Sequence, residues 1–225
     1  MTNQTESGEF SASRSSSEIL SSNLSKGLHA AAQPLTILRA GLAMGLASPL
    51  SLGELRELAA SSYVEVERVC GLFDYMQQLV IVASTKPSLT AAQILPLVAD
   101  AAEGVSVLFE HDGMVLSSQL PDACDPVLID NVRTLRALSS VLLIIHGLSH
   151  ARDTVELNVS SSLPNSIRIV VRNQNLYLAA LSEEASLSMS IADANIRSQH
   201  AGFTWNLKPF SVEIEFQTVQ IAQCC

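Results

Sequence analysis

The chain has 225 residues and a formal net charge of −9 at pH 7, and 48% of its residues are hydrophobic. Such an apolar chain can bury a core, which excludes disorder throughout. Its acidity disfavours a nucleic-acid partner, because phosphate backbones repel negative charge. Glycine is scarce, with only 10 residues, although loops that cradle nucleotide phosphates are usually built from it.

The sequence contains no stretch of 18 apolar residues, and the apolar run 141–145 is broken by His146. The N-terminus lacks the basic and apolar regions of a signal peptide. We therefore expect a soluble, cytoplasmic protein with no membrane partner. The cysteines form no CxxC pair, which predicts reduced thiols and no zinc site. They are Cys70, Cys124, Cys224 and Cys225.

Residues 1–17 are rich in Ser, Thr, Glu and Asn, which predicts a disordered tail. Residues 18–86 then carry apolar residues at seven-residue intervals, a repeat typical of coiled-coil packing. The pattern predicts one helix that begins near residues 17–18 and ends at Ser48-Pro49. A second helix is expected to follow a capping box formed by Ser51 and Glu54.

Each predicted helix carries two apolar series. In the first helix they are Leu24, Ala31, Leu38 and Gly45, and Leu28, Leu35 and Leu42; in the second they are Leu52, Ala59, Val66, Phe73 and Val80, and Leu55, Ser62, Val69 and Met76. A two-helix hairpin cannot bury all of these positions alone. The sequence therefore predicts a homodimer that forms a four-helix bundle. Packing of this face on the rest of the same chain is the alternative.

Residues 85–88 look like a hinge, and residues 87–222 mix helical and strand patterns. The elements predict an α+β sandwich, with helices on one face of a mixed sheet. The predicted helices are 89–103 with a bend at Pro96, 130–150 and 186–199; the predicted strands are 105–109, 114–120, 154–160, 167–173, 203–207 and 211–219, with a turn at Pro164-Asn165.

Residues 28–38 are the most informative segment of the chain. His29 is followed at +5 by Pro34 and at +6 by Leu35. Because His29 lies one residue past Leu28, about 100° round the helix, its imidazole is expected to reach solvent. A neutral imidazole there is a nucleophile that can take a phosphoryl group. An ordinary surface histidine is the plain alternative.

This segment resembles the H-box of the two-component sensor histidine kinases, whose phospho-acceptor histidine precedes Pro and Leu at the same spacings. The predicted hairpin is similar to the dimerisation and phosphotransfer module of that family. The elements from about residue 89 to 219 resemble its ATP-binding sandwich. The resemblance implies that His29 is the phospho-acceptor and that a response-regulator receiver domain is the partner.

The positions that the family uses for ATP and Mg²⁺ are replaced. Ala30 stands where a carboxylate usually follows the histidine. Leucine cannot bind a metal, imidazole is a poor ligand for Mg²⁺, and serine lacks the conformational freedom of glycine. The replaced positions are Leu142 and His146 for two asparagines, Asn173 and Asn175 for an Asp and a Gly, and Ser186 and Ser188 for two glycines. We therefore expect no cofactor bound by this chain.

The sequence favours a histidine phosphotransferase over an ATP-dependent kinase. His29 would exchange a phosphoryl group with receiver domains, and the receiver would supply Mg²⁺. Three alternatives stay open. They are a pseudokinase dimer that serves as a non-catalytic scaffold, a receiver phosphatase in which Gln33 holds a water one turn after His29, and an active but divergent histidine kinase.

Overall fold

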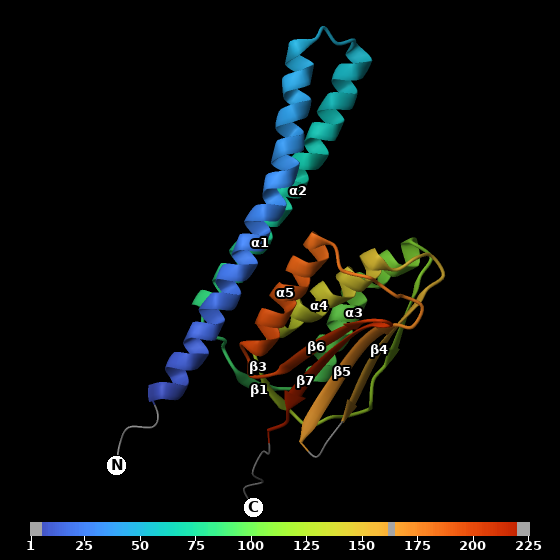
Figure 1. Cartoon of the computed structure of the whole chain (residues 1–225). Helices are drawn as coiled ribbons and strands as arrows, with labels where there is room; N and C mark the ends of the chain where they lie inside the picture. Colours follow the sequence, from blue (N-terminus) through green and yellow to red (C-terminus); the bar gives the residue numbers. More distant parts are fainter. Residues whose placement is uncertain (1–5, 162–164, 220–225) are drawn as a thin grey trace, which may run out of the picture. The chain divides into compact units, whose positions relative to one another are not determined.

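The structure is a computed structural model that describes the backbone of residues 6–161 and 165–219, and the side chains of these residues from 20 onward. The chain divides into two units, Met1–Ser84 and Thr85–Cys225. The first unit is helical, and the second combines helices with a sheet (Figure 1). Each unit is described by itself.

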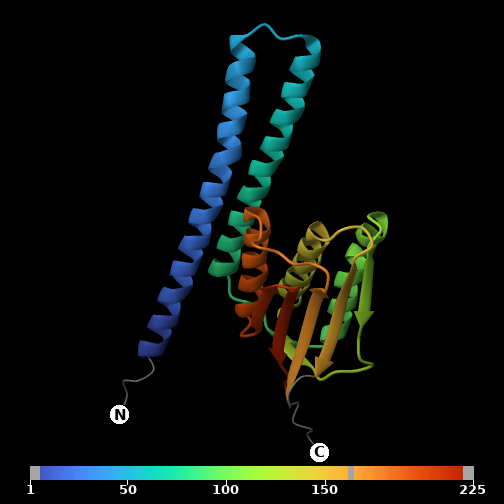
Figure 2. The same cartoon turned by 45° about the vertical axis from the view of Figure 1, so that its right-hand side comes forward.

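The first unit is a hairpin of two long antiparallel helices, α1 (Glu6–Ala47) and α2 (Leu52–Ser84), as Figure 2 shows. The predicted capping box opens α2. Glu54 Oε2 accepts a hydrogen bond from the Ser51 N–H at 2.7 Å, and Ser51 Oγ accepts one from the Glu54 N–H at 3.3 Å.

Helix α1 begins at Glu6, so the predicted disordered tail is wrong for residues 6–17. A helix that is already nucleated gains one hydrogen bond for each residue added, and a serine-rich segment can continue it on that account. Residues 1–5 of the predicted tail lie outside the described residues.

Small residues on α1 allow the two helices to approach closely. Leu58 of α2 packs against Gly41 and Gly45, and its methyl groups occupy the space that a Cβ at Gly45 would need. Because the helices run in opposite directions, this contact fixes the register: residues of α1 and α2 whose numbers sum to about 100 lie at the same level.

The four predicted series lie on different sides of the hairpin. Ala31 is buried and Leu38 is half-buried, on the side of α1 that also carries the two glycines against α2. The other α1 series is exposed: Leu28 by 58%, Leu35 by 45% and Leu42 by 44%. On α2, Val69 and Met76 are buried, whereas the long series is exposed, at Leu52, Ala59, Val66, Phe73 and Val80.

The exposed rows of α1 and α2 form one face. Leu28 follows the buried Gly27, and Phe73 follows the buried Leu72, so each row is turned about 100° from a buried row. In a pair of antiparallel helices, a rotation of the same size and sense along the chain, starting from the row that faces the partner helix, leads to the same side of the pair in both helices. We call this face, made of Leu28, Leu35, Leu42, Leu52, Ala59, Val66, Phe73 and Val80, the apolar face of the hairpin.

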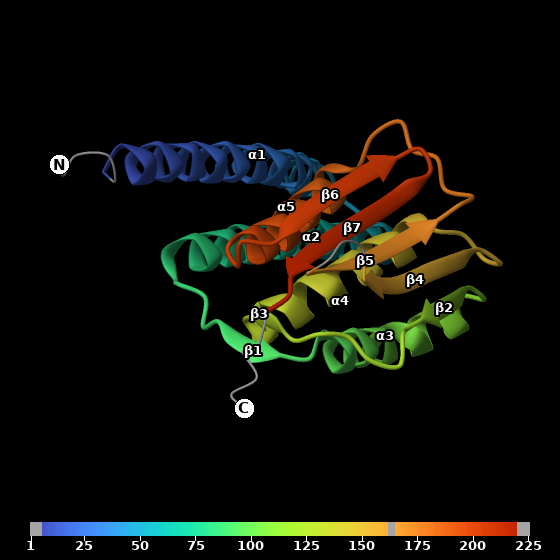
Figure 3. The ribbon, with the colours of Figure 1, turned by 90° about the horizontal axis from the view of Figure 1, so that it is seen from below.

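The second unit is an α+β sandwich, as the sequence predicts. Its five-stranded sheet has the order β2-β4-β5-β7-β6, in which only β2 and β4 are parallel. Three helices cover one face of this sheet (Figure 3). The helices are α3 (Ile94–His111), α4 (Asn131–Leu148) and α5 (Glu183–Arg197); the strands are β2 (Val115–Gln119), β4 (Thr154–Ser161), β5 (Ser166–Asn173), β6 (Gly202–Leu207) and β7 (Phe210–Gln217).

Three expectations for this unit are corrected. Residues 105–109 belong to α3 and not to a strand, because Val98, Val105 and Phe109 continue a helical spacing of buried positions. No bend is needed at Pro96, which lies in the first helical turn, where its missing N–H has no partner anyway. The sequence also misses β1 (Thr90–Ala92) and β3 (Val127–Ile129), which pair in a small separate sheet.

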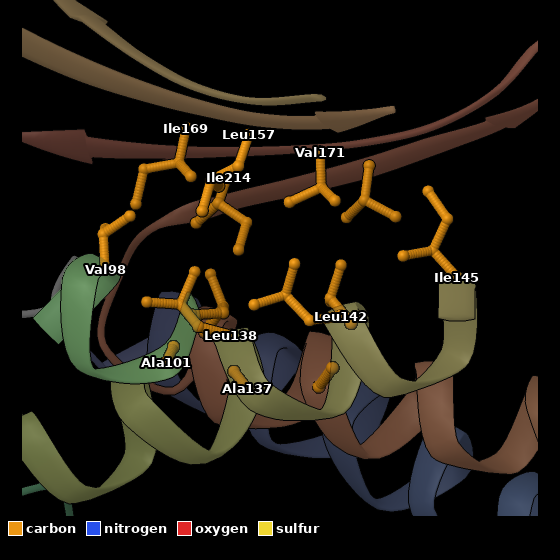
Figure 4. Packing of buried hydrophobic residues seen from close by; sticks show 14 of the residues in the cluster. Val98, Ala101, Ala137, Leu138, Leu142, Ile145, Leu157, Ile169, Val171 and Ile214 are labelled. Carbon is orange, nitrogen blue, oxygen red and sulfur yellow. The ribbon is translucent and has the colours of Figure 1, made fainter. Parts of the chain in front are cut away.

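The core of the second unit lies between the sheet and the helices. Figure 4 shows Leu138, Leu142 and Ile145 of α4 pointing toward the sheet. Leu157 of β4, Val171 of β5 and Ile214 of β7 meet them there; the other labelled core residues are Val98, Ala101, Ala137 and Ile169. Burial of this apolar surface is the main force that holds the unit together.

Candidate functional site

His29 lies in the middle of α1 with an exposed side chain. The expected solvent access is therefore confirmed, whereas its chemical role stays a prediction. The next residue, Ala30, has no carboxylate. Because its side chain is only 2% exposed, it also presents no surface group beside the imidazole. Pro34 lies inside the helix and is buried, and it leaves the carbonyl of Ala30 without its usual helical donor.

The exposed side of α1 around His29 differs from the apolar face. Gln33, Ile37 and Met44 follow His29 at four, eight and fifteen residues, which places all four side chains on one side of the helix. Gln33 is exposed, Ile37 is 48% exposed and Met44 is 69% exposed. This strip, the His29 strip, lies between about 100° and 180° round α1 from Leu28 and Leu35.

The two positions expected for Mg²⁺ ligands serve other purposes. Leu142 is 1% exposed and belongs to the hydrophobic core. His146 binds α3: its Nε2 lies 3.0 Å from Asp112 Oδ2 and 3.3 Å from the Leu108 carbonyl oxygen. Its ring also meets Phe109 edge-on, with centroids 4.9 Å apart. Neither residue offers an oxygen ligand, so the pair does not fit Mg²⁺.

Asn173 stands at the end of β5, at the position where the resemblance to the histidine kinases implies an Asp. It is fully buried, and its side chain is used within the protein. Its Nδ2 donates to Ser149 Oγ and to Asp153 Oδ2, both at 2.9 Å, and its Oδ1 accepts the N–H of Asn175 at 2.9 Å. The amide therefore fastens the loop between α4 and β4 to the end of β5.

Ser186 and Ser188 lie inside α5, which begins three residues earlier than expected. The Ser186 N–H donates to the Ser182 carbonyl at 2.9 Å, so it is not part of a loop that cradles phosphate. Ser182 caps the helix by accepting the Ala185 N–H at 3.2 Å. Glu183 and Glu184 bring two carboxylates to the first turn, where their charge opposes an anionic ligand.

The segment between β5 and α5 packs onto the core. Leu176 is buried, and Leu178 and Leu181 pack against the core beside it. The Leu178 N–H donates to the Leu207 carbonyl at 2.9 Å, and the Phe210 N–H donates to the Leu176 carbonyl at 2.8 Å. Apolar packing and these backbone bonds attach the segment to the turn between β6 and β7.

Sequence reasoning missed Ser149, Asp153 and Asp112. Asp153 Oδ2 accepts the N–H of His150, three residues earlier in the chain, at 3.0 Å. Nothing local in the sequence connects Ser149 and Asp153 with Asn173, since the sheet brings them together. Cys70 and Cys124 are free thiols, as predicted; Pro164, Cys224 and Cys225 lie outside the described residues.

Asn173→Asp is expected to destabilise the second unit and to gain no nucleotide. The new carboxylate would face Asp153 Oδ2 in a fully buried position, where it loses a donor and meets a like charge. We expect a loss of about 2–4 kcal/mol in the free energy of unfolding. Asn175→Asp, at an exposed position, is the matched control and should cost less than about 0.5 kcal/mol. Chemical unfolding checks both values, and equal stability of the two variants would contradict the assignment.

The stability of the second unit is expected to fall in acid. The backbone hydrogen bond from His150, followed by that from Asn173, lowers the pKa of Asp153 below its ordinary value. The charged form is therefore favoured by folding, so its contribution is complete above a pH of about 4 and is lost as the pH falls further. Burial raises the pKa of Asp193, which acts in the opposite direction. Asp153→Asn should flatten the acid limb of the melting temperature measured against pH.

Among the described residues, no helix is long and apolar enough to cross a membrane. In the same part of the chain, no group of three His, Cys, Asp or Glu side chains is arranged to hold a metal ion.

Comparison with solved structures decides the fold. The chain is 13% identical to histidine kinase ThkA, crystallised in complex with the response regulator TrrA, with a TM-score of 0.73 over 97% of this chain and 68% of that one. This chain has the sensor histidine kinase fold. Histidine kinase AdeS of Acinetobacter baumannii shares that fold at 14% identity and a TM-score of 0.60, over 82% of this chain and 95% of AdeS.

Full-length ShkA, crystallised with AMPPNP, is 15% identical, with a TM-score of 0.58 over 83% of this chain. The present chain spans 46% of the length of ShkA. No protein-family model matches the sequence, and no curated protein matches it. The chain thus shares the histidine kinase fold with proteins to which its sequence is only 13–15% identical.

Proposed function

We propose that this chain is a phosphorelay protein in which His29 accepts a phosphoryl group from a receiver domain and donates it to another, without using ATP. One observation carries the proposal: the histidine kinase fold retains an exposed His29, whereas the positions for nucleotide and metal have been turned to internal packing and hydrogen bonding. On this proposal the chain is a cytoplasmic homodimer with neither a nucleic-acid nor a membrane partner.

The proposed transfer requires only one reacting group from this chain, the imidazole of His29. A lone pair of the His29 imidazole attacks phosphorus, the bond from phosphorus to the receiver's aspartyl oxygen breaks, and the aspartate leaves as a carboxylate. The imidazole then loses its N–H proton or shares the positive charge between its nitrogens. The receiver, and not this chain, would hold the Mg²⁺ that screens the transferring group.

The His29 strip supports a receiver partner. It presents a nucleophile beside the exposed apolar side chains of Ile37 and Met44, and apolar area beside a reacting group is what a docking protein can bury. The structural neighbour ThkA was crystallised with a response regulator. The strip and the apolar face occupy different sides of α1, so a docked receiver and a second copy of this chain need not compete for the same surface of that helix.

The apolar face supports the homodimer. Its large side chains are between 40% and 67% exposed in the single chain, and their seven-residue spacing suits packing of helices against helices. A second copy brings the same face and covers both through a two-fold axis, which yields a four-helix bundle.

Gln33 keeps a phosphatase role open as a second candidate. It is exposed one turn after His29 on the same strip, where its amide can hold a water beside a docked aspartyl phosphate. A phosphatase releases inorganic phosphate from the receiver without labelling His29.

One experiment distinguishes these functions. Receiver domains of the same organism, labelled with acetyl [³²P]phosphate and freed of excess donor, are each incubated with the wild-type chain. The proposal predicts acid-labile, alkali-stable label on the chain that disappears in His29→Ala. If labelled phosphate is instead released into solution, if this release requires Gln33, and if the chain stays unlabelled, the chain is a receiver phosphatase and the phosphorelay proposal is wrong. If no receiver transfers its label to the chain or loses it as free phosphate, the proposal is wrong, and the non-catalytic scaffold is the remaining hypothesis.

A further inference from the structure

The segment that joins the two units is held by exposed and partly buried polar bonds and is not the free hinge that the sequence suggests. Arg133 of α4 is 8% exposed. Its Nη2 donates to the Thr85 carbonyl oxygen at 2.8 Å and to Thr85 Oγ1 at 2.6 Å. Its Nη1 donates to Ser198 Oγ at 2.9 Å, just beyond the end of α5. One guanidinium therefore ties the start of the second unit to two helices.

Asp130 fastens the other end of the same segment. Its Oδ2 accepts the Ser88 N–H at 2.9 Å, while its Oδ1 caps α4 by accepting the N–H groups of Val132 and Arg133, both at 3.1 Å. Burial acts to raise the pKa of Asp130, but the hydrogen bond from Ser88 and those from the first turn of α4 hold it below its ordinary value. The carboxylate is therefore charged at neutral pH.

Gln199 connects these bonds to α5. It is 4% exposed, and its Oε1 accepts hydrogen bonds from the Asp130 N–H at 2.6 Å and from the Thr134 hydroxyl at 3.1 Å. Its Nε2 donates to the Asn195 carbonyl of α5 at 2.9 Å. The segment 85–88, the start of α4 and the end of α5 thus share one partly buried network.

Such a network favours two discrete states. A buried guanidinium is tolerated only while its hydrogen bonds are made, because a buried charge that loses a partner is strongly unfavourable. Loss of the Thr85 bonds therefore favours release of the whole group rather than a gradual loosening. Pro87 adds stiffness, because its ring fixes one backbone angle in the middle of the segment.

We propose that Arg133 is a conformational latch that fastens the connection between the hairpin and the sandwich to the ends of α4 and α5. While the latch is closed, movement of the end of α5 shifts the segment that follows α2, and a pull on Thr85 reaches α5. This coupling requires no nucleotide. It stands apart from the proposed function, since it rests on other residues and its test involves no phosphoryl transfer.

Hydrogen exchange of the full chain, followed by mass spectrometry, tests the latch. Arg133→Met keeps most of the side-chain stem and removes the guanidinium. We expect amides in 85–90 to exchange at least about tenfold faster than in the wild type, while amides of β5 and β7 stay within about threefold. Arg136→Met, an exposed position on the same helix, is the matched control and should change neither group. If the amides of residues 85–90 in Arg133→Met exchange at the wild-type rate while the sheet stays protected, the latch proposal is wrong.

If Arg133→Met also accelerates amide exchange in the sheet, a milder variant is needed to test the latch. Thr85→Val removes Oγ1 but leaves the carbonyl, so we expect a smaller acceleration that is confined to 85–90. In a double variant with Ser198→Ala, the acceleration should fall short of the product of the single effects, because one change already weakens the hold on the shared guanidinium and leaves less for the other to remove. Wild-type exchange in Thr85→Val, or independent effects of the two changes, would contradict a shared latch.

Discussion

His29→Ala is expected to abolish phosphoryl uptake by the chain, because it removes the one group that the proposed reaction takes from this protein. The fall should reach the background of the assay, a change of about a thousandfold or more. Because His29 is exposed and alanine is a good helix former, the variant should fold as the wild type does. The measurement is label on the chain after incubation with a phosphorylated receiver.

Two variants sharpen that result. His29→Gln retains a polar side chain without a phospho-accepting nitrogen and should fail in the same way. His111→Ala removes another exposed histidine, at the end of α3, and should keep wild-type uptake. Labelling of His29→Ala at the wild-type rate would show that phosphate reaches a different residue.

Phe73→Glu is expected to convert a dimer into a monomer. Phe73 is 52% exposed in the single chain and lies in the middle of the apolar face. In the proposed four-helix bundle it would be buried, and an unpaired carboxylate there costs several kcal/mol. The dimer should therefore dissociate at least about a hundredfold more readily, which light scattering across a concentration series measures.

Val64→Glu is the matched control for this prediction. Val64 is 63% exposed on the same helix. It lies on the opposite side of α2 from Phe73, about 180° round the helix axis. A charge there should stay in water and leave the molecular mass of the assembly unchanged. A wild-type chain that is monomeric at micromolar concentration, or a Val64→Glu variant that dissociates like Phe73→Glu, would exclude the apolar face as the interface.

The elements with strong local signals were predicted well. The hairpin was foreseen because Ser51 and Glu54 announce a helix start and the seven-residue spacing is long and regular. Sequence spacing alone could not decide which series packs within the chain. The contact of Leu58 with Gly41 and Gly45 decides it, and that contact exists only once α1 and α2 are paired.

The errors have physical causes of the same kind. The strands β1 and β3 have three residues each, too few to show an alternating pattern. Residues 105–109 satisfy a strand pattern locally, yet burial with Val98 and Ala101 makes them helical. The assignment of the replaced family positions rests on the sequence resemblance alone. Their new roles, such as the bonds of Asn173 to Ser149 and Asp153, depend on chain segments that only the folded sheet brings together.

The source of the phosphoryl group distinguishes a phosphorelay protein from an ATP-dependent kinase. Buried Leu142, the fully bonded Asn173 and the carboxylates at the start of α5 oppose nucleotide binding, while exposed His29 remains available. The most direct measurement incubates the wild-type chain with γ-labelled ATP and Mg²⁺, and in parallel with a labelled phospho-receiver. We predict label at His29 from the receiver and none from ATP. Label at His29 from ATP would contradict this prediction.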